Sequence, residues 1–157
     1  MRSKELKVRI GIRIKMRKEL NSKDVEELAV KIESQFGFRI DEKLKYFVKE
    51  EKEGEKIFIF SGNRIPNIQV EWIGLHFGTL IQNEFQPSID GAFLMQTANK
   101  KILQASKKEI EELMKGSVID YSGGLTGFVI ARHKDLACVG IVKEGKVGSL
   151  TPKSRLI

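Results

Sequence analysis

The residues of this chain best suited to contact an anion lie near its first residue. In the stretch KVRIGIRIKMRK, residues 7–18, apolar residues hold every second position from Val8 to Met16, and the alternate positions from Lys7 to Arg17 carry five cations and no acid. The cations central to this stretch are Arg9, Arg13, Lys15 and Arg17. A period of two predicts a half-buried strand with its cations on one face, about 6.6 Å apart at about 3.3 Å of rise per residue. Such a face can bind phosphate groups, or it can be a solvated face that protects an edge strand from aggregation.

The charge of the chain favours the first of these alternatives. The 157 residues carry a net charge of +7, and residues 1–20 hold eight Lys or Arg against two acids. Clustered cations gain free energy by releasing the counterions that condense on nucleic acid. We therefore expect a polyanionic partner.

Residue types that carry catalysis are sparse. The single cysteine, Cys138, lies in the apolar run LACVGIV, where an inert buried thiol is expected. The two histidines, His76 and His133, have no carboxylate or cysteine at metal-ligand spacing. The sequence contains no Walker loop, dinucleotide-binding fingerprint or nucleophile elbow. We predict a protein that is not an enzyme and that needs no metal or cofactor.

Composition also sets an expectation for the compartment. Hydrophobic residues make up 41% of the chain, enough for a globular interior. No segment approaches the roughly 18 uninterrupted apolar residues of a membrane span, and the basic first residues lack the continuous apolar block of a signal peptide. We expect a soluble cytoplasmic protein without a membrane partner.

The elements that must position these residues begin with a helix and a hairpin. Asn21 is a plausible helix N-cap and Gly37 a plausible end, because glycine adopts the left-handed conformation readily. The apolar positions between them fall at i, i+3, i+4 and i+7 and are Val25, Leu28, Ala29 and Ile32. LKYFV and KIFIF, residues 44–48 and 56–60, predict two strands joined by a charged, solvated turn.

The remainder predicts short strands and two helices. Residues 68–73 alternate as a strand, 74–78 are expected to turn, and 79–81 form a second short strand. Pro87 and Ser88 open a short helix, and the capping box from Ser106 to Glu109 opens another. The closing strands are expected at residues 118–120, 127–132, 136–142 and 147–150. Short strands with glycine turns indicate a small barrel or pseudo-barrel.

The predicted fold class is therefore α+β in two parts. Residues 1–65 form a small N-terminal subdomain of helix and sheet, and residues 66–157 form a β pseudo-barrel. The boundary is placed at Arg64-Ile65-Pro66-Asn67, where proline and asparagine interrupt regular secondary structure between two strand-like segments.

One part of the sequence resembles a known family. GLHFGTL…EFQPSIDGAFLM resembles a motif in the C-terminal PUA-like domain of the Fmu/Sun (NOL/NOP) family of RNA cytosine-C5 methyltransferases. The matching positions are Gly74, Leu75, Gly78, Phe85, Pro87 and Ser88. SKKEIEELMKG resembles that domain's second helix, and GFVIARH…SRLI resembles its closing hairpin and basic end, so the resemblance spans about residues 44–157. A small α/β domain followed by a PUA domain is also found in small ribosome-biogenesis factors.

The resemblance implies an RNA-binding surface. PUA domains bind RNA with a glycine-containing loop near the first helix and with the last strand. Carried over, the implied residues are Gly74, Leu75, His76, Phe77, Gly78, Lys146, Lys153 and Arg155. Phe77 can stack on a base or pack in the core, and His76 can contact a base or be a polar turn residue. Lys100 and Lys101 extend the basic surface or are merely solvated.

The same resemblance also limits the function. The methyltransferases have a large S-adenosylmethionine domain and a catalytic cysteine pair, which this chain lacks, so methyl transfer is not carried over. We expect a noncatalytic protein that binds ribosomal RNA or its precursor during ribosome biogenesis. Two alternatives stay open. One is an adaptor that docks an RNA methyltransferase or an assembly factor through the 56–60 hairpin as a sheet edge. The other is an RNA-modifying enzyme without a recognisable motif.

Overall fold

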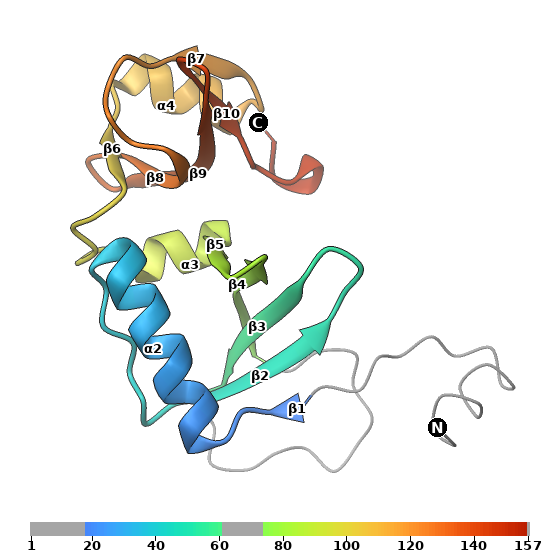
Figure 1. The fold of residues 1–157 in the computed structure, drawn as a ribbon. Helices are drawn as coiled ribbons and strands as arrows, with labels where there is room; N and C mark the ends of the chain where they lie inside the picture. Colours follow the sequence, from blue (N-terminus) through green and yellow to red (C-terminus); the bar gives the residue numbers. More distant parts are fainter. Residues whose placement is uncertain (1–17, 61–73, 157) are drawn as a thin grey trace, which may run out of the picture.

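The computed structural model describes residues 18–60 and 74–156, with the element order shown in Figure 1. The elements are β1 (Lys18–Glu19), α2 (Ser22–Phe36), β2 (Lys45–Glu50), β3 (Glu55–Phe60), β4 (Leu75–Ile81), β5 (Glu84–Pro87), α3 (Ile89–Leu94), β6 (Ile102–Gln104), α4 (Lys107–Met114), β7 (Val118–Asp120), β8 (Gly127–His133), β9 (Leu136–Lys143), β10 (Lys146–Ser149) and the 3₁₀ helix η1 (Lys153–Arg155). The predicted strand at residues 68–73 lies outside the described residues, as does the predicted basic strand except for Lys18.

The first sheet has the strand order β1-β2-β3-β4-β5, every pair antiparallel, and α2 packs against it. The helix forms as predicted. The side chain of Asn21 accepts a hydrogen bond from Asp24 N at 2.8 Å, and Gly37 ends the helix with φ of 66°. The buried face consists of Val25, Leu28, Ile32 and Phe36.

The predicted hairpin is confirmed. β2 and β3 pair from Lys45 opposite Phe60 to Glu50 opposite Glu55, around a short turn. Because side chains alternate across a strand, Tyr46, Val48 and Ile57 enter the core under α2. The intervening residues of β2 and β3, among them Lys49, Lys56 and Phe58, therefore lie on the opposite face of the sheet.

The predicted turn at residues 74–78 is wrong. Leu75–Ile81 is strand β4, hydrogen-bonded to β3 on one side and to β5 on the other. The glycine at position 78 is needed for space, because a Cβ there would lie 2.3 Å from the ring of Phe85. Gly74, with φ of 79°, provides a left-handed residue just before the strand.

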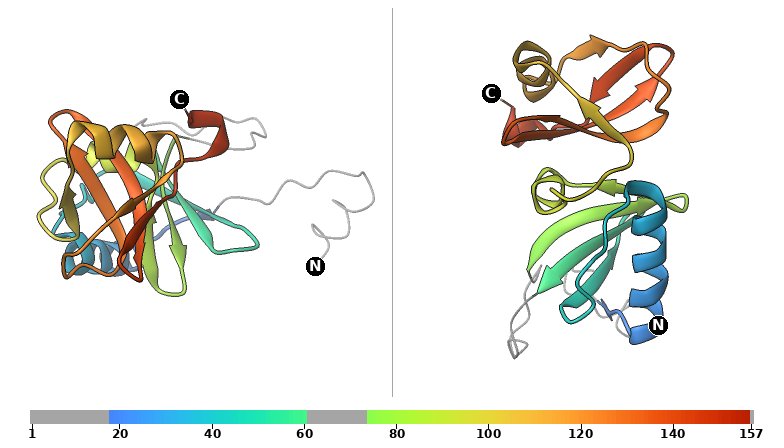
Figure 2. Two further views of the ribbon diagram at one scale, coloured as in Figure 1. Left: turned by 90° about the horizontal axis from the view of Figure 1, so that it is seen from above. Right: turned by 90° about the vertical axis from the view of Figure 1, so that its left-hand side faces the viewer.

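Helix α3 lies between the two sheets (Figures 1 and 2). It starts where the sequence predicts, because the Ser88 hydroxyl accepts a hydrogen bond from Gly91 N at 2.8 Å. The same hydroxyl donates to the carbonyl of His76 at 2.5 Å. The start of α3 is therefore tied to β4.

The second sheet has the order β6-β8-β9-β10-β7, with β6 parallel to β8 and the other pairs antiparallel. The capping box of α4 is confirmed, because Ser106 and Glu109 each bind the other's backbone N–H. The mixed α+β class is thus confirmed. In the described residues β6 and β7 are the two edges of an open sheet, so the finer prediction of a pseudo-barrel is not confirmed.

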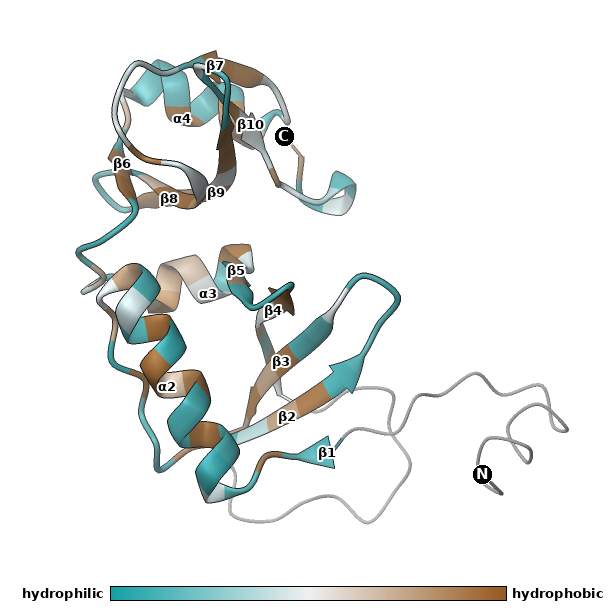
Figure 3. Cartoon of the chain, viewed as in Figure 1, coloured by the Kyte–Doolittle hydropathy of each residue, from teal (hydrophilic) through white to brown (hydrophobic). Residues whose placement is uncertain are grey.

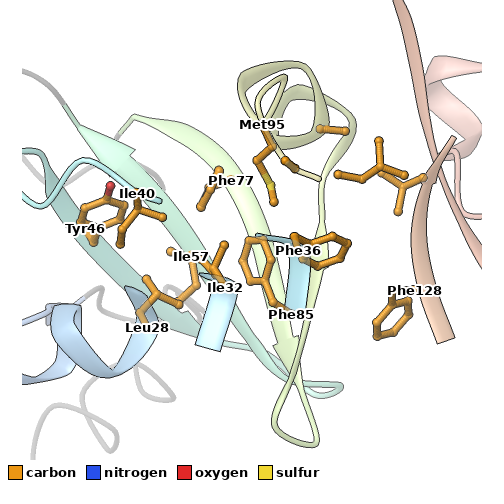
Figure 4. Close-up of a cluster of buried hydrophobic side chains, with 14 of the residues drawn as sticks. Leu28, Ile32, Phe36, Ile40, Tyr46, Ile57, Phe77, Phe85, Met95 and Phe128 are labelled. Atoms are coloured by element: carbon orange, nitrogen blue, oxygen red, sulfur yellow. The ribbon is translucent and has the colours of Figure 1, made fainter. Parts of the chain in front are cut away.

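Strands β8 and β9 are buried on both faces and are largely hydrophobic (Figure 3). Phe128 and Ile130 of β8 face α2, α3 and the first sheet, in the cluster shown in Figure 4. Val129 and Ala131 face α4 in a second cluster, which also holds Cys138, buried as expected. One hydrophobic core therefore joins the two sheets.

The predicted domain boundary falls between β3 and β4, where the structure does not describe the chain. It stays a prediction. The strands that flank it pair with each other, so residues 75–87 share a sheet with residues 45–60.

Candidate nucleic-acid interface

The end of the chain contacts the start of α3. The guanidinium of Arg155 lies over the carboxylate of Asp90, with Nη1 to Oδ2 and Nη2 to Oδ1 both at 3.5 Å. About half of each side chain is exposed, 48% for Arg155 and 42% for Asp90. This contact joins η1, near the end of the chain, to α3.

We call residues 150–156 the C-terminal strap, and its attachment explains the position of Arg155. Ser149 Oγ, just before the strap, and Thr151 Oγ1 both donate to the carbonyl of Leu113 at the end of α4, at 2.5 and 3.1 Å. Leu156 lies against Gly116, where an added Cβ would meet its side chain at 2.9 Å. The strap is therefore held on α4 at both ends.

His76 of β4 is also near Asp90. Its Nε2 lies 3.1 Å from the carbonyl oxygen of Gly78, which can only accept, so Nε2 carries the proton and Nδ1 carries the acceptor lone pair. The ring packs 5.3 Å from that of Phe58. Burial first, and then the positive charge of Lys56, lower the pKa of His76 below 6.5, while Asp90 partly opposes this shift. The imidazole is therefore neutral at pH 7.

Two lysines of the β2–β3 hairpin complete this surface. Lys49 Nζ and Lys56 Nζ lie 3.5 and 3.7 Å from the same carboxylate oxygen of Glu51. Strand β3 of this hairpin pairs with β4, with Phe58 opposite His76 and Lys56 opposite Thr79. We call the whole set the charged row: Lys49, Glu51, Lys56, His76, Asp90 and Arg155.

The sequence does not single out Lys49 and Lys56 as site residues, because the charged turn between the two strands is expected to be merely solvated. A signal was present in the alternation of residues 56–60, which places Lys56 and Phe58 on one face. What the sequence did not show is that β4 and α3 lie beside that face.

The predicted loop residues separate into surface and core. Leu75 is 39% exposed and His76 is half-buried, at the edge of the charged row. Phe77 is 1% exposed and packs against Phe85 in the core. The core-packing alternative therefore describes Phe77, and its ring offers no stacking face in this fold.

The other predicted cations lie on different elements. Lys100 and Lys101 follow α3 and lie beside the end of α2, where Asn99 N and Lys100 N both donate to the carbonyl of Phe36 at 3.0 Å. The ammonium of Lys101 donates to the carbonyl of Thr126. Within the described residues, neither lysine shares a hydrogen-bond or ion-pair partner with the charged row.

Lys146 belongs to a third location. It begins β10, and its ammonium lies 2.9 Å from Asp120 on the edge strand β7. Lys153 is exposed on the C-terminal strap, two residues from Arg155. The cations at positions 9, 13, 15 and 17, namely Arg9, Arg13, Lys15 and Arg17, lie outside the described residues. The structure thus brings His76 and Arg155 to one region through Asp90, and Lys153 lies two residues before Arg155 along the chain.

A pocket of about 460 Å³ lies elsewhere, between β1, the first half of α2 and the start of β2. Its charged lining holds Glu19, Glu26 and Glu42 against Lys43 and Lys45. Among the described residues, its lining holds more acids than cations, and none of the predicted RNA contacts lies there. A polyanion is therefore disfavoured there.

Among residues 18–60 and 74–156, no His, Cys, Asp and Glu side chains gather in a group that could hold a metal ion. No helix in these ranges is long and apolar enough to span a bilayer.

Comparison with known proteins leaves the resemblance to PUA domains as a prediction. No family model matches the chain, and no curated protein matches it either. The chemistry of the charged row and the distribution of charge along the chain are therefore the observations that bear on the function of this protein.

Proposed function

We propose that this is a noncatalytic RNA-binding protein of the cytoplasm, which binds ribosomal RNA or its precursor in ribosome biogenesis. The observation that carries the proposal is the arrangement at the C-terminal strap. Arg155 pairs with Asp90, whose charge acts on His76, and Lys153 lies two residues before Arg155. All three of His76, Lys153 and Arg155 belong to the residues that the PUA resemblance implies for RNA binding. The net charge of +7 favours the same partner class.

The chemistry of His76, Lys153 and Arg155 divides into two tasks. Cations hold phosphate groups without regard to sequence, and Arg155 and Lys153 are exposed enough to do so. A neutral His76 instead offers the lone pair of Nδ1 as a hydrogen-bond acceptor, which suits a base amino group or a 2′-hydroxyl. Phosphate contacts would position the RNA, and His76 would contribute local selectivity.

The adaptor hypothesis loses its specific mechanism. It requires β3 to be a free sheet edge, but β3 pairs with β2 on one side and β4 on the other. A partner strand therefore has no backbone hydrogen bonds to make there. The alternative of an RNA-modifying enzyme is tested by calorimetry with S-adenosylmethionine, where we expect no heat of binding.

RNA binding is tested by affinity for a ribosomal RNA fragment, with duplex DNA as the competing polyanion, across a salt series. Three variants are compared with wild type: one with Arg9, Arg13, Lys15 and Arg17 changed to Gln, one with Lys153 and Arg155 changed to Gln, and a two-charge control. The control changes Lys31 and Arg39 to Gln, on the side of the first sheet that α2 covers.

Each lost phosphate contact should flatten the slope of log K against log salt by roughly 0.7–0.9. We expect a flatter slope for the first two variants and a slope near that of wild type for the control. Equal slopes for all four proteins would mean that neither set of cations contacts RNA. Equal affinity of wild type for RNA and duplex DNA would reject RNA as the specific partner.

A further inference from the structure

We propose that Asp90 is an internal competitor of RNA phosphate, which occupies Arg155 until RNA displaces it. This inference rests on the proposed function and adds the regulation of one of its contacts. The carboxylate of Asp90 faces both terminal nitrogens of the guanidinium. A phosphate group binds the same fork of N–H donors in the same two-point manner.

The contact between Asp90 and Arg155 is loose. Both N–O distances are 3.5 Å, whereas a strong charge-assisted hydrogen bond measures about 2.7–2.9 Å. About half of each side chain faces water. Exposed pairs of this kind contribute little to stability, so their exchange for another anion is easy.

Release from Asp90 leaves Arg155 in place. The C-terminal strap is attached to α4 through Thr151 and Leu113 and through Leu156 beside Gly116, and none of these contacts involves Asp90. The guanidinium can therefore change its anionic partner without detachment of the chain end. The strap provides a fixed base for a side chain that exchanges between two anions.

The exchange has a cost that falls on Asp90. When a phosphate takes Arg155, the carboxylate loses its partner and faces a second negative charge. Asp90 therefore opposes the binding of every polyanion. Contacts between the same polyanion and other cations of the chain offset this unfavourable contribution. Removal of this acid should strengthen RNA binding, and it should do so only while Arg155 is present.

The test is a double-mutant cycle on the full chain with a labelled ribosomal RNA fragment, measured by fluorescence anisotropy. The variants are Asp90→Asn, Arg155→Gln and the two together. Glu33→Gln is the matched control, because it also removes an acid that pairs with an arginine, Arg39, at 3.6 Å. We expect Asp90→Asn to bind RNA about twofold to fivefold more tightly than Glu33→Gln does.

In the Arg155→Gln background, Asp90→Asn should tighten binding no more than Glu33→Gln does. Circular dichroism of each variant confirms the fold, and Asp90→Ser replaces Asp90→Asn if the latter unfolds. Equal affinities of Asp90→Asn and Glu33→Gln, with RNA binding retained, would overturn the inference and leave the proposed function standing. No RNA binding by wild type would overturn both.

Discussion

The side-chain amide of Gln35 forms two hydrogen bonds with the backbone of Phe85. Its Nε2 donates to the carbonyl oxygen of Phe85, and its Oε1 accepts from the Phe85 N–H, both at 2.9 Å. Phe85 lies in β5, the edge strand of the first sheet. The amide therefore takes the place of a neighbouring strand at this position and satisfies the backbone N–H and C=O of Phe85.

Gln35→Ala should lower the free energy of unfolding by about 2–3 kcal/mol. The substitution leaves a partly buried N–H and C=O of Phe85 without partners, and an unsatisfied group costs about 1–3 kcal/mol. Urea unfolding followed by circular dichroism measures the change. Val30→Ala is the control on the same helix, because Val30 is 69% exposed and alanine favours helix. Equal stability of the two variants would show that water replaces the amide at no cost.

The same contact shows what the sequence could and could not predict. Helix α2 and the capping box of α4 follow from local rules, because Asn21, Gly37, Ser106 and Glu109 act within a few residues of themselves. Gln35 and Phe85 are 50 residues apart, and no periodicity links them. Local sequence patterns therefore predict the helices and strands, whereas contacts between distant residues determine which backbone groups at a strand edge find a hydrogen-bond partner.

The candidate site was predictable to a similar extent. Its residue types were recognised at His76 and Arg155, but the partner that joins them, Asp90, lies 65 residues from Arg155. The turn predicted at residues 74–78 failed for the related reason that Gly78 is fixed by the ring of Phe85, a contact across strands. A glycine can mark a backbone that needs a left-handed conformation, or a position with no room for a side chain. The sequence alone does not distinguish these two reasons.

Arg132→Met should destabilise the fold by about 1–2 kcal/mol and leave RNA affinity unchanged. The guanidinium of Arg132, in β8, donates to the carbonyls of Met95 and Ala98 just after α3, and so links the second sheet to that helix. Desolvation lowers the pKa of Arg132, in agreement with a partly buried position. Its loss removes charge-assisted hydrogen bonds that stay partly solvated.

Thermal and urea unfolding measure the stability of Arg132→Met, and anisotropy with the ribosomal RNA fragment measures its affinity. Arg39→Gln is the control for loss of one cation, because Arg39 pairs only with the exposed Glu33 among the ion pairs of the described residues. A loss of RNA affinity in folded Arg132→Met, beyond that of Arg39→Gln, would assign Arg132 to the interface instead.

His76 should make the stability of the fold depend on pH near neutrality. Its pKa in the folded protein is lowered below 6.5, the ordinary value that we take for the unfolded chain. Between these two pKa values the unfolded state binds more protons than the folded state, so the free energy of unfolding falls as pH falls through about 6.5. The contribution is fully present above that pH and stops changing below the folded pKa.

His76→Gln isolates this contribution, since a glutamine amide can still donate to the carbonyl of Gly78 but does not titrate. We expect wild type to lose free energy of unfolding relative to His76→Gln as the pH falls from 7.5 to 5. Urea unfolding at each pH gives this difference, and carboxylates that titrate in both proteins cancel from it. A difference that stays constant over this range, or moves in favour of wild type at low pH, would show that the imidazole is not held neutral by burial and Lys56.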